Sequence, residues 1–285
     1  MVPAKADFYT LPKAMYNLDA IKPLLVDGNN AILYKRLSNS MLNMEKIIVS
    51  HSLVYVISGR VEIQTYDYES VSLKEGEMLF MPRDSYLISD YVKKDEDMEV
   101  YLFFFDHLIS SEFLQHIKIP KRERKNTLLK LNLSSNIKTY LNALKQMSYE
   151  NNAHLLRVKL FELLHLIHES NRDFASLLKE TEEKRAKRDI QSYMLEHYDK
   201  KLSVNDWASI SGLSLSTFNR KFKQNYQLSP KKWILKQNMQ LANEALQKGA
   251  SVSECASEFG YANSSNFIKA FKDIYKKTPK QYILT

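Results

Sequence analysis

Residues 251–279 read SVSECASEFGYANSSNFIKAFKDIYKKTP, and this stretch decides the fold of the C-terminal third. It begins with the S-x-x-E spacing of a helix capping box, and Gly260 then supplies a residue suited to a sharp turn. Phe267 and Phe271 follow one helical turn apart, which gives a second helix an apolar face. A capped helix, a glycine turn and a second two-faced helix are typical of a helix-turn-helix.

Residues 203–230 carry a second copy of this pattern, SVNDWASISGLSLSTFNRKFKQNYQLSP. Gly212, Phe218 and Phe222 stand where the other copy has its glycine and two phenylalanines. The segment 230–248 joins the copies and predicts a linking helix of about 28 Å, at about 1.5 Å per residue. We therefore predict an all-α double helix-turn-helix, whose recognition helices would contact DNA about 10 bp apart.

The second helix of each copy has a polar face opposite its phenylalanines. Arg220 and Asn219 lie on that face in the first copy, and Lys269 lies on it in the second. Arginine can bind guanine through two hydrogen bonds, asparagine can bind adenine, and lysine attracts phosphate. For either helix alone, a merely solvated face is the alternative. The residues expected at DNA are Ser216, Thr217, Asn219, Arg220, Lys223, Ser264, Ser265, Asn266, Lys269 and Lys272, with Lys231, Lys232, Lys276 and Lys277 expected at phosphates.

The charge of the chain is concentrated in the same region. The 285 residues include 41 Lys+Arg and 33 Asp+Glu, a net charge of +8. Residues 1–183 hold 23 and 25 of these, net -2, so residues 184–285 hold 18 and 8, net +10. A basic rear behind a near-neutral front predicts a polyanionic partner for the rear, most often nucleic acid. A solvated basic surface is the alternative on charge alone.

The front of the chain has the pattern of a sheet. Between residues 46 and 107, short runs rich in Val, Ile, Tyr and Phe are separated by turn signals, which predicts a small antiparallel barrel or sandwich. Ser58 and Gly59 separate two of these runs at hairpin spacing, and Gly76 marks another turn. The predicted fold class is thus α+β with two domains, a β-barrel with helices followed by the all-α repeat.

A helix is predicted from about residue 154 to 169 because five apolar residues there lie on one helical face. This stripe can pack on its own barrel, pair with the same helix of a second chain, or do both. The residues expected at such a dimer contact are Leu156, Leu160, Leu163, Leu164 and Ile167. The charged segment that follows suggests a junction, so we expect domains at 1–175 and 189–285 with a linker at 176–188.

The chain has one cysteine, Cys255, which excludes an internal disulfide framework. The first ten residues lack the apolar core of a secretory signal, and no apolar run approaches the roughly 18 to 20 residues of a membrane span. We expect a cytoplasmic protein that does not bind membranes.

At the residues of the second copy the sequence closely resembles the AraC/XylS family of transcription regulators. The motif A-x-x-x-G-[FY]-x-x-x-S-x-F-x-[KR]-x-F-K, closing on [ST]-P, runs here from Ala256 to Pro279. The resemblance implies seven helices and two helix-turn-helix subdomains over roughly residues 190–283. Gln227 and Lys276 replace the glycine usual before Ser/Thr-Pro, which predicts a different helix C-cap, and Lys269 replaces the usual arginine.

The strand region is similar to the cupin-like sensor domain that precedes this unit in many family members. More narrowly, residues 52–63 and 73–89 resemble the activators of bacterial type III secretion genes. The narrower resemblance implies a front domain that self-associates and binds an anti-activator protein, whereas the wider one implies a small molecule inside the barrel. The residues that could line a ligand cavity are Tyr55, Phe80, Tyr86, Tyr101 and Phe103.

Metal chemistry is not expected in the front domain. Catalytic cupins hold a metal with histidine and carboxylate ligands on neighbouring strands, but His51 stands alone and no H-x-H occurs. We therefore expect no cofactor, no metal and no enzymatic activity. A cupin metalloenzyme with a helical appendage and a protein-interaction switch are the alternatives. We predict a sequence-specific DNA-binding transcription regulator that acts as an activator and not as a repressor. It would bind promoter DNA, recruit RNA polymerase and form a homodimer.

Overall fold

The computed structural model describes residues 9–66, 68–94, 96–119, 127–146, 150–186, 190–197 and 202–283. The chain divides into two compact units. The sheet-rich unit comprises residues 1–188 together with 205–214, and the helical unit comprises residues 189–204 together with 215–285. A sheet-rich front followed by a helical rear confirms the predicted α+β class.

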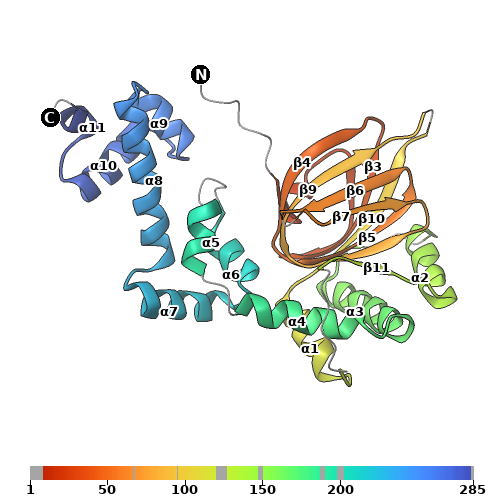
Figure 1. Cartoon of the computed structure of the whole chain (residues 1–285). Coiled ribbons are helices and arrows are strands. Elements are labelled where there is room, and N and C mark those ends of the chain that lie inside the picture. The colour runs from red at the N-terminus through yellow and green to blue at the C-terminus, as the bar shows by residue number, and fades with distance from the viewer. Residues whose placement is uncertain are drawn as a thin grey trace. The chain divides into compact units, whose positions relative to one another are not determined.

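The strands of the sheet-rich unit form two sheets (Figure 1). In spatial order, the five-stranded sheet contains β1 (Tyr9–Leu11), β4 (Met41–Ile48), β9 (Asp84–Tyr91), β6 (Arg60–Thr65) and β7 (Ser70–Lys74). The six-stranded sheet contains β11 (Leu129–Leu131), β8 (Met78–Met81), β5 (His51–Ser58), β10 (Met98–Phe105), β3 (Asn30–Leu37) and β2 (Ile21–Asp27). The predicted closed barrel is therefore corrected to two separate sheets, since among the described strands no hydrogen-bonded pairing joins one sheet to the other.

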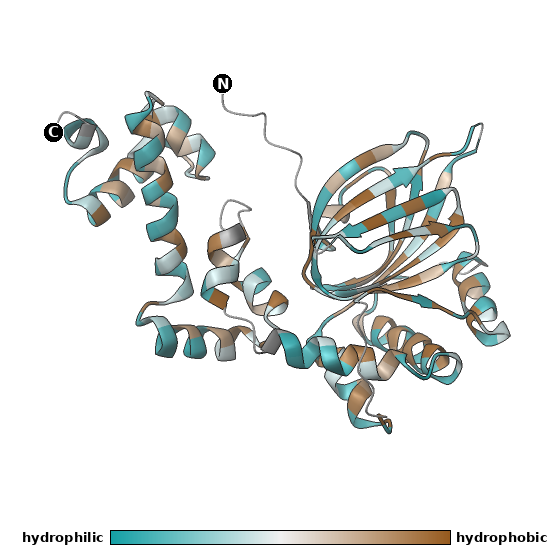
Figure 2. Ribbon diagram, viewed as in Figure 1, coloured by the Kyte–Doolittle hydropathy of each residue, from teal (hydrophilic) through white to brown (hydrophobic). Residues whose placement is uncertain are grey.

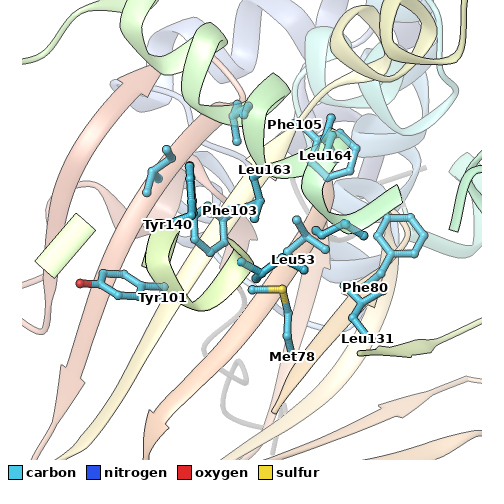
Figure 3. Packing of buried hydrophobic residues seen from close by; sticks show 14 of the residues in the cluster. Leu53, Met78, Phe80, Tyr101, Phe103, Phe105, Leu131, Tyr140, Leu163 and Leu164 are labelled. Carbon is cyan, nitrogen blue, oxygen red and sulfur yellow. The ribbon is translucent and has the colours of Figure 1, made fainter. Parts of the chain in front are cut away.

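Strand β10 runs through the centre of the six-stranded sheet, antiparallel to both β3 and β5. Its side chains alternate between two hydrophobic cores because successive residues of a strand point to opposite faces. Tyr101, Phe103 and Phe105 enter the core under the helices, shown in Figure 3, whereas Leu102 and Phe104 enter the core between the sheets. Hydrophobic residues are seen on the strands of the sheet-rich unit in Figure 2.

Gly59 connects the two sheets instead of forming the predicted hairpin. Strand β5 belongs to the six-stranded sheet, and β6 pairs with β7 and β9 in the other. Gly59 has a φ of +88°, and a Cβ there would lie 2.8 Å from both Met98 Cγ and Tyr91 O. The glycine is required by this close corner, which has the same residue spacing as a hairpin and cannot be told from one by sequence.

Helices cover one side of the six-stranded sheet (Figure 1). They are α1 (His107–Gln115), α2 (Ser135–Gln146), α3 (Ala153–Ser170) and α4 (Phe174–Ala186). The unit also contains a short 3-10 helix, η1 (Lys13–Met15), and α6 (Val204–Ile210). Much of the segment expected as a linker is helix α4, and its first turns are anchored in the core by Phe174, Leu177 and Leu178.

The helical unit contains α5 (Ile190–His197), α7 (Leu215–Tyr226), α8 (Pro230–Gln247), α9 (Val252–Glu258), α10 (Ser264–Tyr275) and α11 (Pro279–Ile283). With α6, the described C-terminal region has the seven helices that the family resemblance implied. The predicted capping box is present, formed by Ser251 and Glu254 before α9. Helix α8 is also capped, because the Ser229 side chain accepts from the Lys232 amide. Across the described residues, no helix combines the length and hydrophobicity that crossing a membrane requires.

Candidate nucleic-acid interface

The second helix-turn-helix is built around one small core. Cys255 and Ala256 of α9 pack with Phe267 and Phe271 of α10 and with Met239 of α8. Both phenylalanine rings are fully buried. Because this core fixes the inner face of α10, the opposite face of the helix points outward.

The outward face of α10 carries the residues predicted to read DNA. Ser265, Asn266, Lys269 and Lys272 are exposed, while Ser264 is half-buried. A further residue, which sequence reasoning missed, orients the start of this face. Asn263 is the N-cap of α10, and its Oδ1 accepts a hydrogen bond from the Asn266 backbone amide at 2.9 Å. An asparagine directly before a polar first turn was the available signal for this cap.

Helix α7 is anchored in the same way within the helical unit. Phe218 and Phe222 are buried, and the Phe222 ring meets Trp233 of α8 edge-to-face with centroids 6.2 Å apart. Arg220 lies on the exposed side of α7. Asn219 is half-buried, and its Nδ2 donates to Leu215 O at 2.8 Å, so binding a base with this amide requires that bond to break. Of the other residues predicted at DNA on this helix, Ser216 and Lys223 are exposed and Thr217 is half-buried.

The cations predicted at the interface were compared with the ion pairs of the part of the chain that the structure describes. Lys231 and Lys232 are exposed in the first turn of α8, and Lys276 and Lys277 are exposed directly after α10. Among the described residues, no ion pair with Asp or Glu involves these four lysines or the other predicted cations Arg220, Lys223, Lys269 and Lys272. Their charge is therefore available to a phosphate backbone.

The expectation of a different C-cap after the two recognition helices is corrected by the backbone. Gln227 and Lys276 adopt the left-handed conformation that glycine usually takes, with φ of +57° and +60°. Each side chain returns to its own helix: Gln227 Nε2 donates to Gln224 O at 3.1 Å, and Lys276 Nζ donates to Asp273 O at 2.7 Å. The cap geometry is thus kept without glycine, at a cost in backbone strain.

The apolar stripe of α3 faces the sheet. Leu156, Leu160, Leu163, Leu164 and Ile167 are all buried in the core under the helices. Figure 3 shows Leu163 and Leu164 in the same cluster as Phe103. Within this chain the stripe packs on its own sheet, and the exposed side of α3 carries other residues, among them Val158.

Four of the five aromatic residues proposed for a ligand cavity share one hydrophobic core, and the fifth, Tyr86, lies in another. Tyr55, Phe80, Tyr101 and Phe103 lie in or against the core under the helices, whereas Tyr86 lies in the core between the sheets. The Tyr86 hydroxyl donates to Pro82 O at 2.5 Å. Tyr86 is separated from the other four because its side chain points to the core between the sheets and theirs point to the core under the helices.

A buried ionic cluster in the sheet-rich unit was not predicted. Glu182 of α4 accepts hydrogen bonds from His51 Nε2 at 2.8 Å, Ser110 Oγ at 2.6 Å and Arg83 Nη2 at 2.5 Å. Burial alone would raise the pKa of the Glu182 carboxyl, but the hydrogen bonds and charges of His51 and Arg83, with the Ser110 bond, hold it far below its usual range. These residues lie far apart in the sequence, so no local pattern indicated the cluster.

The same cluster explains the lone histidine of the sheet. His51 Nδ1 accepts from the Arg83 backbone amide at 3.4 Å, so His51 Nε2 carries the proton that is donated to Glu182. Both ring nitrogens are thus used in hydrogen bonds. Among the described residues, His, Cys, Asp and Glu nowhere gather in a group of three that could hold a metal ion.

Comparisons with known proteins match both parts of the chain. Residues 51–177 match the ExsA N-terminal regulatory domain, and residues 207–284 match a helix-turn-helix domain. The chain is 27% identical over 260 residues to the virulence regulon transcriptional activator VirF of Yersinia enterocolitica, covering 84% of this chain and 92% of VirF. It is 26% identical over 256 residues to the thermoregulatory protein LcrF of Yersinia pestis, with 84% and 92% covered.

Among solved structures, the crystal structure of an apo ToxT variant from Vibrio cholerae is similar over 91% of this chain and 98% of that chain, with a TM-score of 0.42 and 11% identity. The two domain matches fall on the sheet-rich front and on the helix-turn-helix repeat, as the motif predicted. The chain therefore belongs to the AraC/XylS family of DNA-binding transcription regulators, with an ExsA-type regulatory domain in front of its helix-turn-helix domain.

Proposed function

We propose that this protein activates transcription by binding an asymmetric promoter site through two recognition helices, α7 and α10. The observation that carries the proposal is the pairing, within one unit, of two helices with buried phenylalanine faces and exposed cationic faces. The relative VirF is described as a transcriptional activator, which supports activation over repression. Recruitment of RNA polymerase follows from that role.

Base reading is assigned to one basic residue in each helix. Arg220 of α7 can bind guanine through two parallel hydrogen bonds in the major groove, and Lys269 of α10 can bind guanine or phosphate through a single ammonium group. The first block of the site therefore has the sharper sequence preference. Helix α8 has 18 residues and is about 27 Å long at about 1.5 Å per residue, which suits two blocks about 10 bp apart.

The regulatory domain would receive the signal. Its match to the ExsA N-terminal regulatory domain supports a regulatory role. The expected signal is a partner protein or a small-molecule effector in the cytoplasm, and the expected assembly is a homodimer. The five leucine and isoleucine residues of α3 are engaged with the sheet, so a dimer contact by this helix would use the opposite side, where Val158 is 61% exposed.

The test is selection of genomic DNA fragments by the full-length protein at about 150 mM salt, where nonspecific contacts weaken. We expect a motif of two blocks about 10 bp apart. Arg220→Ala should erase the preference for one block and Lys269→Ala should weaken the other, each by about 1 to 3 kcal/mol. Lys221→Ala is the matched control, because Lys221 is an exposed cation on α7 with no assigned base. Failure to enrich any motif, or equal loss on cognate and random DNA for Arg220→Ala, would contradict the proposal.

A further inference from the structure

The aromatic residues that follow each recognition helix repeat along the chain. Tyr226 closes α7 and Tyr275 closes α10, and each ring lies on the second buried phenylalanine of its own helix, with centroids 4.7 and 4.6 Å apart. At the fourth residue of the next helix, Trp233 of α8 and Tyr282 of α11 meet the same two phenylalanines edge-to-face, at 6.2 and 5.8 Å. Each repeat therefore extends beyond its helix-turn-helix and ends in a cluster of three rings.

The two ring clusters are fastened to α8 in different ways. In the first cluster, Trp233 is itself a residue of α8. In the second cluster, the closing ring belongs to α11, and the link to α8 is a hydrogen bond of 3.2 Å that the Tyr275 hydroxyl donates to Met239 O. A helix carbonyl has two lone pairs and uses one of them inside the helix, so this bond leaves α8 intact. Both recognition helices are thus held by the same linking helix, and all of these residues belong to the helical unit.

The hydrogen bond adds a direction that the surrounding packing lacks. Met239 is fully buried in one core with Phe267 and Phe271, and Tyr275 is half-buried against this core. Apolar packing is non-directional, whereas a hydrogen bond has a preferred length and angle. The contacts of the Tyr275 ring with Phe271 and Tyr282 move together with α10 and α11. The bond to Met239 O, by contrast, breaks when α10 slides or turns against α8.

The position of α10 on α8 decides which spacing of two DNA blocks the protein fits. Each base pair advances the duplex by about 3.4 Å and turns it by about 35°. One base pair added between the blocks therefore displaces and rotates the second block relative to the first. To follow the second block, α10 must move against α8, and this movement costs the bond between Tyr275 and Met239.

We propose that Tyr275 is a positioning residue that makes the protein selective for the spacing between its two DNA blocks. Its hydroxyl is engaged with Met239 O, so it acts through α8 on the place of Lys269 and not by binding a base. Binding to the correct spacing keeps the bond, whereas binding to a longer or shorter spacing breaks it. The inference rests on the proposed function and adds to it the residue that sets the spacing.

The experiment compares three DNA duplexes with the full-length protein: the selected two-block site, and the same site with one base pair added or removed between the blocks. Tyr275→Phe keeps the ring and removes only the hydroxyl. Its preference for the selected spacing over the other two should be about threefold to tenfold smaller than that of wild type, the range expected for one hydrogen bond. The base preferences within each block should stay unchanged. A spacing preference equal to that of wild type would overturn the inference, even with weaker binding to all three duplexes, because a merely structural role weakens them alike.

Tyr261→Phe is the matched control. Tyr261 packs half-buried against the same core, with its ring edge-to-face on Phe267 at a centroid distance of 5.6 Å. Within the described residues its hydroxyl makes no hydrogen bond. This variant should keep the spacing preference of wild type. An equal decrease in both variants would show that any hydroxyl lost from this core relaxes the spacing, and would remove the specific role of Tyr275.

A second measurement reports the bond without DNA. Amide hydrogen exchange of residues 267–275 in the free full-length protein should be faster in Tyr275→Phe, because α10 has lost a tie to α8, and should match wild type in Tyr261→Phe. Unchanged exchange of this segment in Tyr275→Phe would show that the bond does not hold α10, and the inference would fail.

The proposed function and this inference fail in different ways. If wild type selects no motif of two blocks, the proposed function is overturned and the inference with it. If wild type selects two blocks but binds all three spacings equally, or if Tyr275→Phe keeps the wild-type preference, the inference alone is overturned.

Discussion

Phe222 of α7 and Trp233 of α8 meet edge-to-face, with ring centroids 6.2 Å apart. Both side chains are nearly fully buried, and Phe222 also contacts Phe218 and Tyr226. This aromatic pair sets the angle at which α7 leaves the linking helix. The first recognition helix therefore depends on one indole for its position within the helical unit.

Trp233→Ala should lower the free energy of unfolding of the helical unit by about 3 to 5 kcal/mol, because it removes a large buried ring and leaves a cavity. Denaturant unfolding of the full chain measures this change. Lys236→Ala, an exposed residue on the same helix, is the control and should change stability by less than about 0.5 kcal/mol. A similar small effect for Trp233→Ala would show that the pair does not support α7.

Gln227→Gly should stabilise the protein by about 0.5 to 1 kcal/mol. Gln227 has a φ of +57°, and glycine adopts this conformation without the steric cost that a Cβ brings. Gln224→Gly is the matched control: the same substitution one turn earlier, inside α7, should destabilise by about 1 kcal/mol. Opposite signs of the two changes in melting temperature are expected, and equal destabilisation would argue against the left-handed cap.

Lys231→Ala should weaken binding to the two-block DNA and to random DNA by the same factor. Lys231 lies in the first turn of α8, where a cation can bind phosphate but has no assigned base. The slope of log affinity against log salt should fall by about 0.9 for one lost phosphate contact. Lys248→Ala, at the other end of α8, should keep the wild-type slope. Loss confined to cognate DNA would instead assign a base to Lys231.

Asp90→Asn should destabilise the sheet-rich unit by about 3 to 5 kcal/mol, because two ammonium groups share this one buried carboxylate. Lys35 hydrogen-bonds to Asp90, and Lys46 Nζ lies 3.5 Å from its Oδ2. All three residues are buried. Lys35→Met should be close to neutral, since it leaves one lysine for one carboxylate. Denaturant unfolding measures the free energy of unfolding of both variants. A larger decrease in Lys35→Met than in Asp90→Asn would contradict the prediction.

The same site predicts a pH dependence. Burial, together with the charge of Lys46, lowers the pKa of Lys35 to about 8, whereas an unfolded lysine titrates near about 10.4. Between these values the unfolded chain binds more protons, so the free energy of unfolding rises with pH, by up to about 3 kcal/mol. Below pH 8 both states are protonated and this contribution is flat. The free energy of unfolding of wild type minus that of Lys35→Met should grow from about pH 7.5 to 10. Taking this difference cancels the titration of the tyrosines, which both proteins share. A difference that stays constant over this range would contradict the lowered pKa of Lys35.

Local patterns predicted the helical unit well. The capping box at Ser251 and the spacing of the phenylalanines each involve residues within a few positions of each other, so the helices they predict do not depend on the rest of the chain. The candidate DNA residues of α7 and α10 followed from the same periodicity. The N-cap Asn263 has a local signal of the same kind, an asparagine directly before the polar first turn of α10.

The sheet-rich unit was predicted only in outline. The density of Val, Ile, Tyr and Phe indicated strands, but Gly59 marks a corner between sheets and not a hairpin. Strand pairing depends on partners far along the chain, such as β3 and β10, and a hydrophobic run does not specify its partner. For the same reason the sequence did not show that Tyr86 lies in a different core from the other four aromatic residues predicted at a ligand cavity.

By itself, the sequence determined that this protein carries two helix-turn-helix repeats, a basic rear and a sheet-rich front, because helix caps, periodicity and charge act over short distances. Only the tertiary structure decided that Glu182 and Arg83, separated by 99 positions, form a buried ion pair under Gly212. The tertiary structure alone also placed α6 in the sheet-rich unit. Those contacts join residues that no local pattern relates, and burial in a low-dielectric interior makes their pairing obligatory.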